Sequence, residues 1–403
     1  MTESKTSALT LIPREVLFGN PEKAQPRLSP DGECLAYLAP VDGVLNVWLG
    51  SARGEAGGGG FKPVTEDRKR GIRLYFWAED GRFLIYLQDQ DGDENWRLYA
   101  VDLEEGGTRD LTPFDGVQAQ LVSKSKHFPD QVLIGLNKRD PQLHDVYRLH
   151  PATGDLELVA ENPGNVTGWV ADAEMKVRGA LAATPDGGFE LLLRDSEDEG
   201  WNKIATFGPE DGLNSAPVGF SQDGERMYLL DSRGANAARL VSKELPDSAS
   251  EVLAEDPDYD VGGVLINPDN HEVEAVAFTR ARTEWTVLSE EVREDFETIK
   301  TLHPGDFAVT GRDRADETWV VVFTADNGAT SYYSYDRKSK RGTHLFDDRP
   351  ELAEYELAPM EPVSFTTRDG LTIHGYLTLP PGEGGEGLPM VLNVHGGPWT
   401  RDE

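Results

Sequence analysis

The stretch from Leu28 to Ala39, LSPDGECLAYLA, is the first of seven similar stretches, and their recurrence decides the fold. Each stretch has a polar turn that contains Asp, followed by a strand of alternating apolar residues. The other six are WAEDGRFLIYLQ from Trp77, HFPDQVLIGLN from His127, VADAEMKVRGALA from Val170, FSQDGERMYLLDS from Phe220, INPDNHEVEAVAF from Ile266 and RADETWVVVFTA from Arg314. Several turns contain Asp-Gly, a pair that accepts the positive φ of a tight hairpin. The pattern therefore predicts a repeated antiparallel hairpin.

The spacing of these turns is that of propeller blades. The anchoring residues are Asp31, Asp80, Asp130, Asp172, Asp223, Asp269 and Asp316, which are 49, 50, 42, 51, 46 and 47 residues apart. A second strand that carries aromatic residues follows the first, as in residues 45–49 and 331–335. Such a small sheet cannot bury both of its faces alone, so the copies have to stack, and about seven of them close into a ring.

Two other all-β arrangements fit the spacing less well. A long β-solenoid has a shorter period, and two β-sandwiches in series lack a uniform one. We therefore predict a mainly β fold in which a seven-bladed β-propeller spans residues 26–350, after an N-terminal segment of residues 1–25. The third and fourth copies have lost the turn glycine, so the blade boundaries are least sharply defined there.

The pattern changes after Phe346. An acidic stretch with prolines, DDRPELAEYELAPMEP, reads as a connection between domains. It leads to a predicted hairpin of residues 363–367 and 371–379, and a loop then precedes the predicted strand Met390–Val394, which runs into His395-Gly396-Gly397-Pro398. We interpret residues 351–403 as the incomplete start of an α/β-hydrolase domain, whose first strands pack poorly because a parallel hydrolase sheet needs helices on both faces.

The loop before that strand contains a motif that we reject as a cofactor site. Gly382, Gly384 and Gly387 have the G-x-G-x-x-G spacing of dinucleotide-binding loops. A phosphate-binding loop lies between a strand and the N-terminus of a helix, whereas this one lies between two predicted strands and carries Glu383 and Glu386. We read it as a surface loop, and the sequence predicts no cofactor and no metal.

The His-Gly-Gly-Pro segment is the best candidate for chemistry. An α/β-hydrolase uses a buried strand that ends in His-Gly-Gly to place a backbone N–H beside its nucleophile. Such an N–H, aimed at the oxyanion of acyl transfer, lowers the barrier by roughly 3 kcal/mol. The alternative is a tight turn with a buried histidine.

Composition limits the partners. With 39 Lys and Arg against 72 Asp and Glu, the net charge of −33 disfavours nucleic acid and anionic membranes as partners. Cys34 is the single cysteine, so no internal disulfide forms, and its apolar neighbours suggest a small core residue. The first residues lack the features of a secretory signal, so the predicted location is the cytoplasm.

The sequence resembles the prolyl oligopeptidase family of serine peptidases, in the branch of acylaminoacyl peptidases and dipeptidyl-peptidase-like enzymes. The resemblance spans nearly the whole chain and is carried by LFGNPEKAQPRLSPDG, NWRLYAVDLEEGGTRDLTPFDGVQA, FTRARTEWTVLSEEVREDF, RDGLTIHGYLTLP and LNVHGGPWTRDE. It implies a propeller that restricts access, so that short peptides reach the active site. It further implies an oxyanion hole formed by the backbone at Gly396, with His395 and Gly397 shaping the turn.

The catalytic triad is the part of the pattern that the sequence lacks. The resemblance implies a Ser, Asp, His triad from later in the chain, with the serine in a G-x-S-x-G elbow, and that motif occurs nowhere in the 403 residues. We therefore expect the front portion of a serine peptidase, inactive by itself. Two alternatives stay open: a free-standing propeller that binds peptides or proteins, and, with less support, a propeller hydrolase with a central metal.

Overall fold

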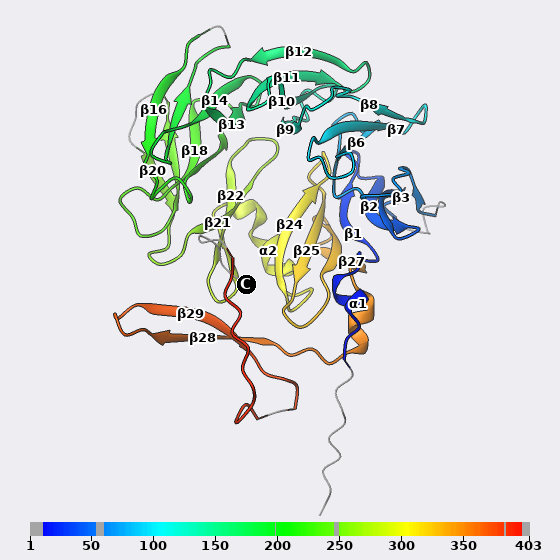
Figure 1. Ribbon diagram of the computed structural model, residues 1–403, viewed down its shortest axis with the longest axis vertical. Coiled ribbons are helices and arrows are strands. Elements are labelled where there is room, and N and C mark those ends of the chain that lie inside the picture. Colours follow the sequence, from blue (N-terminus) through cyan, green and yellow to red (C-terminus); the bar gives the residue numbers. More distant parts are fainter. Residues whose placement is uncertain (1–10, 54–59, 198, 246–249, 383, 397–403) are drawn as a thin grey trace, which may run out of the picture.

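The structure is a computed structural model that describes residues 11–53, 60–197, 199–245, 250–382 and 384–396. The strands up to residue 347 form seven antiparallel sheets, blades 1 to 7, that follow one another in chain order around a ring (Figure 1). The strands of blades 1 to 4 are β1 (Ala24–Leu28), β2 (Cys34–Val41), β3 (Val44–Ser51) and β4 (Lys62–Pro63); β5 (Leu74–Trp77), β6 (Phe83–Gln88), β7 (Arg97–Asp102) and β8 (Thr108–Asp110); β9 (Ala119–Ser123), β10 (Val132–Asp140), β11 (Leu143–His150) and β12 (Asp155–Ala160); and β13 (Val166–Ala171), β14 (Val177–Ala183), β15 (Phe189–Leu193) and β16 (Asn202–Phe207). Those of blades 5 to 7 are β17 (Ala216–Phe220), β18 (Arg226–Asp231), β19 (Arg239–Glu244) and β20 (Ser250–Ala254); β21 (Val261–Ile266), β22 (Val273–Thr279) and β23 (Thr283–Val287); and β24 (Asp306–Arg312), β25 (Thr318–Thr324), β26 (Ser331–Asp336) and β27 (Arg341–Asp347). The predicted seven-bladed propeller is confirmed.

The Asp-containing turns join the first strand of each blade to the second. In blade 1, the Asp31 carboxylate accepts the N–H of Glu33 at 3.0 Å and the Ser29 hydroxyl at 2.5 Å, while Gly32 adopts a φ of 75°. In blade 5, Asp223 accepts the N–H of Glu225 at 3.0 Å in the same way. The repeated sequence motif is therefore the hairpin between the innermost strand and its neighbour.

The apolar core lies between adjacent blades rather than within them. Ile85 and Leu98 of blade 2 pack in one cluster with Ile134 and Leu149 of blade 3, and all four side chains are fully buried. Cys34 is partly buried against the cluster between blades 1 and 2, close to its predicted place in a core. This alternation of sheet and side-chain layer continues around the ring.

The ring closes between blades 1 and 7 without a shared strand. Both blades are built from one continuous stretch of chain, and β1 contacts β24 directly. Leu28 and Leu35 pack against Val320 across this seam, and the Arg314 N–H donates to the Pro30 carbonyl at 2.7 Å. Just outside the seam, the Glu22 N–H donates to the Asp348 carbonyl at 2.8 Å. Side-chain packing and these few hydrogen bonds thus close the ring.

Blade 6 departs from the expected four-strand pattern. Three strands form its sheet among the described residues, and the chain then continues into the short helices η2 (Glu290–Val292) and α2 (Arg293–Ile299). Phe296 and Ile299 of α2 pack against Trp319 and Phe323 of blade 7. A helix therefore fills the space beside blade 7.

The chain leaves the propeller through the 3₁₀ helix η3 (Pro350–Glu354), which lies beside the N-terminal helix α1 (Arg14–Phe18) in Figure 1. Arg349 donates to the carbonyl of Val16 at 3.1 Å and ties the two segments together. The hairpin of β28 (Met360–Thr366) and β29 (Thr372–Thr378) follows, close to its predicted bounds.

The predicted strand Met390–Val394 is wrong for this structure. These residues form no regular element, and the side chains of Met390, Val391, Leu392 and Val394 are 82%, 91%, 76% and 74% exposed. An isolated strand of a parallel sheet has no backbone partners, so its apolar sequence alone does not make it a strand. No helix within the described ranges is both long and apolar enough to cross a membrane.

Candidate functional site

The predicted oxyanion residues lie on an exposed C-terminal segment. His395 Nδ1 is 2.6 Å from the Gly396 carbonyl oxygen, and both residues are exposed. A Cβ built on Gly396 would meet nothing within 4 Å. Gly397, the third predicted member, lies outside the described residues together with Pro398. The His395 ring thus contacts the Gly396 backbone, and the described residues form no substrate pocket around the two.

The hairpin β28–β29 presents one face to the propeller. The Tyr376 hydroxyl donates to the Ala281 carbonyl at 3.0 Å, and the ring of His374 lies 6.3 Å from that of Tyr259. Ala281 belongs to the connection between β22 and β23 in blade 6. The hairpin therefore lies against the end of the ring where the second strands of the blades connect to the third.

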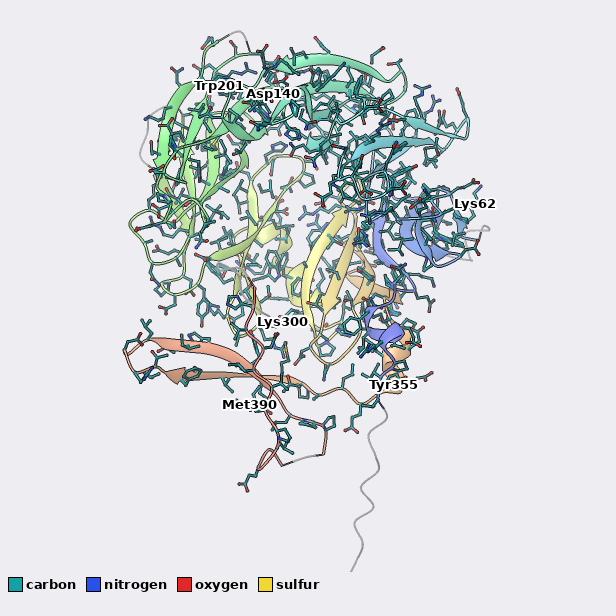
Figure 2. The ribbon with its side chains drawn as sticks, in the orientation of Figure 1. Lys62, Asp140, Trp201, Lys300, Tyr355 and Met390 are labelled. Atoms are coloured by element: carbon teal, nitrogen blue, oxygen red, sulfur yellow. The ribbon has the colours of Figure 1, made fainter. Side chains whose placement is uncertain are left out.

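The opposite face of the hairpin is apolar and uncovered. Its cross-strand register pairs Phe365 with Ile373 and Glu361 with Leu377, so these side chains share a face with Val363. The large side chains of this face are between 40% and 61% exposed: Val363, Phe365, Ile373 and Leu377. In Figure 2, Met390 lies on the segment beyond this hairpin and outside the ring of sheets.

Asp326 fastens the hairpin to the propeller. Its carboxylate accepts the Met360 N–H at 2.5 Å and the Arg282 guanidinium at 2.9 Å, and thus connects blades 6 and 7 to the first residue of β28. Burial would raise the pKa of Asp326, but the hydrogen bonds from Arg282 and Met360 hold it below its ordinary value. The carboxylate is therefore charged at neutral pH.

The propeller has a central cavity of about 570 Å³ at the opposite end of the ring. Its lining takes residues from the end of the innermost strand of all seven blades, or from the turn that follows this strand. The hairpin contacts the second-to-third connections, and successive connections of an antiparallel sheet lie at opposite ends. The cavity is therefore the far end of the channel as seen from the hairpin.

Sequence reasoning missed this cavity, because its lining comes from seven stretches that only the ring brings together. The sequence could have indicated the cavity only through basic side chains that follow an innermost strand, as in Ser123-Lys124-Ser125-Lys126. Within the described part of the chain, no group of three His, Cys, Asp or Glu side chains is arranged to hold a metal ion.

Comparison with known proteins gives relatives that are peptidases. No protein-family model matches the chain. The chain is 41% identical over 399 residues to dipeptidyl aminopeptidase BIII of Pseudoxanthomonas mexicana, a match that covers 97% of this chain and 57% of that protein. It is 28% identical over 437 residues to dipeptidyl peptidase family member 6 of Caenorhabditis elegans, which covers 98% of this chain and 58% of the relative.

Solved structures support the fold alone. A prolyl endopeptidase superposes with a TM-score of 0.63 at 12% identity, covering 89% of this chain and 54% of that one. A puromycin-hydrolysing peptidase of Mycobacterium tuberculosis superposes with a TM-score of 0.62 at 15% identity, covering 93% and 61%. The chain thus spans somewhat more than half the length of the curated relatives that it matches.

Proposed function

We propose that this chain is the front portion of a serine peptidase of the prolyl oligopeptidase family, because its curated relatives are dipeptidyl peptidases and a prolyl endopeptidase shares its fold. In this proposal the complete enzyme hydrolyses short peptides through an acyl-enzyme. Residues 26–350 restrict access to the site, and residues 351–403 begin the α/β-hydrolase domain. The triad of Ser, Asp and His comes from residues outside these 403, which hold no G-x-S-x-G elbow.

The uncovered apolar face of β28–β29 carries this proposal. Val363, Phe365, Ile373 and Leu377 lie open on one side of the hairpin, and the apolar residues 390–394 are open as well. Contiguous apolar surface of this kind calls for another layer of protein. Both the open hairpin face and the open residues 390–394 are expected if these residues are the first strands of a hydrolase sheet, which further strands and helices would cover.

Gly396 has the central chemical role in the proposal. Its backbone N–H stabilises the oxyanion of the tetrahedral intermediate, while His395 and Gly397 shape the turn. A side chain at this position would stand in the path of the substrate carbonyl.

We also keep the cytoplasm as the proposed location, because a single cysteine provides no disulfide.

A fluorophosphonate probe tests the serine peptidase assignment. We expect no labelling of the 403-residue chain, and labelling of a protein expressed from a reading frame that continues past residue 403 into a G-x-S-x-G elbow. Labelling of the 403-residue chain would show that the nucleophile lies within it. A stop codon directly after residue 403, combined with peptide binding, would favour the free-standing binding module.

A substitution in the complete protein tests the oxyanion role. Gly396→Ala should lower kcat/KM by about 100-fold or more, because its methyl group stands in the path of the substrate carbonyl and keeps the oxyanion from the backbone N–H. Gly384→Ala is the matched control, since a Cβ there also meets nothing within 4 Å but lies in the surface loop. Equal kcat/KM values in both variants would contradict the role.

A further inference from the structure

Side chains reach across the far end of the propeller channel and narrow it. Lys126 follows the innermost strand of blade 3, yet it pairs with Asp269 of blade 6 and donates to the Arg314 carbonyl of blade 7 at 3.3 Å. Arg314 in turn donates to the Glu79 carbonyl of blade 2. These contacts join blades that are not neighbours in the ring, so they narrow the cavity of about 570 Å³ at this end.

Cationic side chains dominate this cavity, although the chain as a whole carries a net charge of −33. The cationic lining residues are Arg27, Lys124, Lys126, Arg312 and Arg314, and the anionic ones are Glu79, Asp172 and Asp313. The two aspartates are engaged by their own turns. Asp172 accepts the N–H groups of Glu174 and Lys176 at 3.0 Å each, and Asp313 accepts that of Glu317 at 2.8 Å.

Lys124, Lys126 and Arg312 form ion pairs, whereas no ion pair among the described residues engages Arg27 or Arg314. Lys124 pairs with Glu79, and Arg312 pairs with Glu274 at 2.5 Å. The Arg27 guanidinium lies 5.5 Å from the centre of the Tyr75 ring, and its Nε is buried without a hydrogen-bond acceptor. In a chain with 72 acidic residues, an arginine left without a carboxylate in a cavity is a group available to an anionic ligand.

The surroundings of Arg27 suit the end of a peptide. Arg314 is brought close by its backbone hydrogen bond to Pro30, and it meets the Glu79 carbonyl rather than a carboxylate. Apolar walls are supplied by Leu28, Phe76, Trp77 and Phe220. A planar carboxylate fits a guanidinium through two parallel hydrogen bonds, and the apolar walls can hold the last side chain.

We propose that the cavity at the far end of the channel binds the C-terminal carboxylate of a peptide, with Arg27 as the anchoring cation and Arg314 beside it. This inference rests on the proposed function in one respect, namely that peptides enter the channel. The innermost strand β1 has five residues and so spans about 16 Å. A peptide of about five or more extended residues is needed to reach Arg27 from the hairpin side.

A binding cycle on the 403-residue chain tests the site without any catalysis. The ligands are a neutral hexapeptide with an acetylated N-terminus and a free C-terminal carboxylate, and the same peptide as its C-terminal amide. Titration calorimetry should show that the wild-type chain binds the carboxylate about tenfold or more tightly than the amide. Arg27→Gln should remove this preference and leave the affinity for the amide unchanged.

Two further variants test whether the carboxylate preference depends on the cavity arginines. Arg53→Gln is the matched control, because Arg53 is an exposed arginine of the same blade paired with Glu33, and it should keep the full preference. Arg314→Gln should reduce the preference and serves as the second test if Arg27→Gln does not fold, as judged by circular dichroism. Equal binding of acid and amide by the wild type, or no binding of either, would overturn the proposal.

Inorganic phosphate separates a peptide site from a general anion site. Phosphate that binds as tightly as the peptide carboxylate, with the same dependence on Arg27, would overturn the assignment to peptides. The fluorophosphonate experiment is independent of this cycle. A complete protein that is labelled while acid and amide bind equally would refute the carboxylate site alone, whereas carboxylate-dependent binding without labelling would refute the serine peptidase alone.

Discussion

The glycine in the Asp-containing turn is needed for its backbone conformation in one blade, and for both its conformation and its small size in another. Gly32 and Gly81 occupy equivalent turns of blades 1 and 2, with φ of 75° and 76°. A Cβ on Gly81 would meet only the Pro30 Cδ at 3.8 Å, whereas a Cβ on Gly32 would lie 3.0 Å from an Asp313 carboxylate oxygen. Gly32 is therefore needed both for its backbone conformation and for the approach of blade 7.

We expect Gly81→Ala to destabilise the protein by about 1 kcal/mol through the left-handed backbone alone. Gly32→Ala should cost more than Gly81→Ala, because its methyl group also displaces Asp313 from the N–H groups that it accepts at the seam. Urea unfolding of the two variants measures the difference. Equal midpoints would show that Asp313 moves aside freely.

At the scale of elements, helix α2 is held to blade 7 by a buried carboxylate. Asp295 is fully buried, and it accepts the Tyr335 hydroxyl and the Arg337 guanidinium at 3.0 Å each and the Lys340 ammonium at 2.5 Å. Burial and the neighbouring Asp295 charge raise the pKa of Tyr335, so its hydroxyl stays protonated and donates. The helix that replaces a regular outer strand is thus fixed by charge as well as by packing.

Asp295→Asn should therefore destabilise the fold by about 3 kcal/mol, since it leaves two cations without their buried partner. Glu294→Gln is the matched control on the same helix. Glu294 is largely exposed and lies 3.8 Å from Lys340, so its loss should change stability by less than about 1 kcal/mol. Urea unfolding compares the two, and a small effect of Asp295→Asn would mean that water replaces the lost charge.

The link between propeller and hairpin should depend on pH. The pKa of Asp326 is held below its ordinary value of 3.8, so the stabilisation by the carboxylate is complete above that value and is lost as the pH falls through the lower pKa of the folded state. Asp326→Asn mimics the protonated form at neutral pH. It should speed hydrogen exchange in the peptide around Met360, whose N–H loses its charged acceptor.

Asp369→Asn provides the comparison for this experiment. Asp369 also has a lowered pKa, through the Thr367 hydroxyl, but it lies at the tip of the hairpin and forms no hydrogen bond or ion pair with the described part of the propeller. Exchange around Met360 should not change in this variant. An equal acceleration in both variants would indicate a general loosening of the hairpin.

The sequence predicted the elements that form through interactions among their own residues. The Asp-containing turns repeat because each needs the same backbone geometry, and all seven proved to be the first hairpin of a blade. Helix α2 was missed, since the period of the repeat favours a strand there and the helix depends on partners in blade 7. The strand expected at Met390–Val394 depends on neighbouring strands, which its own residues cannot supply.

At the scale of the whole molecule, side-chain contacts between blades hold the ring together. Neighbouring blades are joined by side chains such as Trp77, which donates to the Arg27 carbonyl at 3.2 Å, and Trp169, which donates to the His144 carbonyl at 3.0 Å. The contacts of Lys126 add a brace across the channel between blades on opposite sides. Local sequence patterns cannot show such a brace, because its members are far apart in the chain.

Lys126→Ala should loosen the turns at the far end of the channel without unfolding the ring. Hydrogen exchange should become faster in residues 124–130 and 266–273, which lie on opposite sides of this brace. Lys203→Ala removes a pair of similar type with Glu190 within blade 4, and it should leave those turns unchanged. Unchanged exchange in Lys126→Ala would mean that the turns hold their positions by themselves.

The hydrogen bond between Glu22 and Asp348 has a consequence for whatever flanks the propeller. It holds the Glu22 nitrogen 2.8 Å from the Asp348 carbonyl oxygen, so the chain enters and leaves the ring at the same place. The segments on either side are thereby tethered side by side, at an effective concentration on the order of millimolar. Contacts between them need little affinity of their own, since the seven blades have already brought them together.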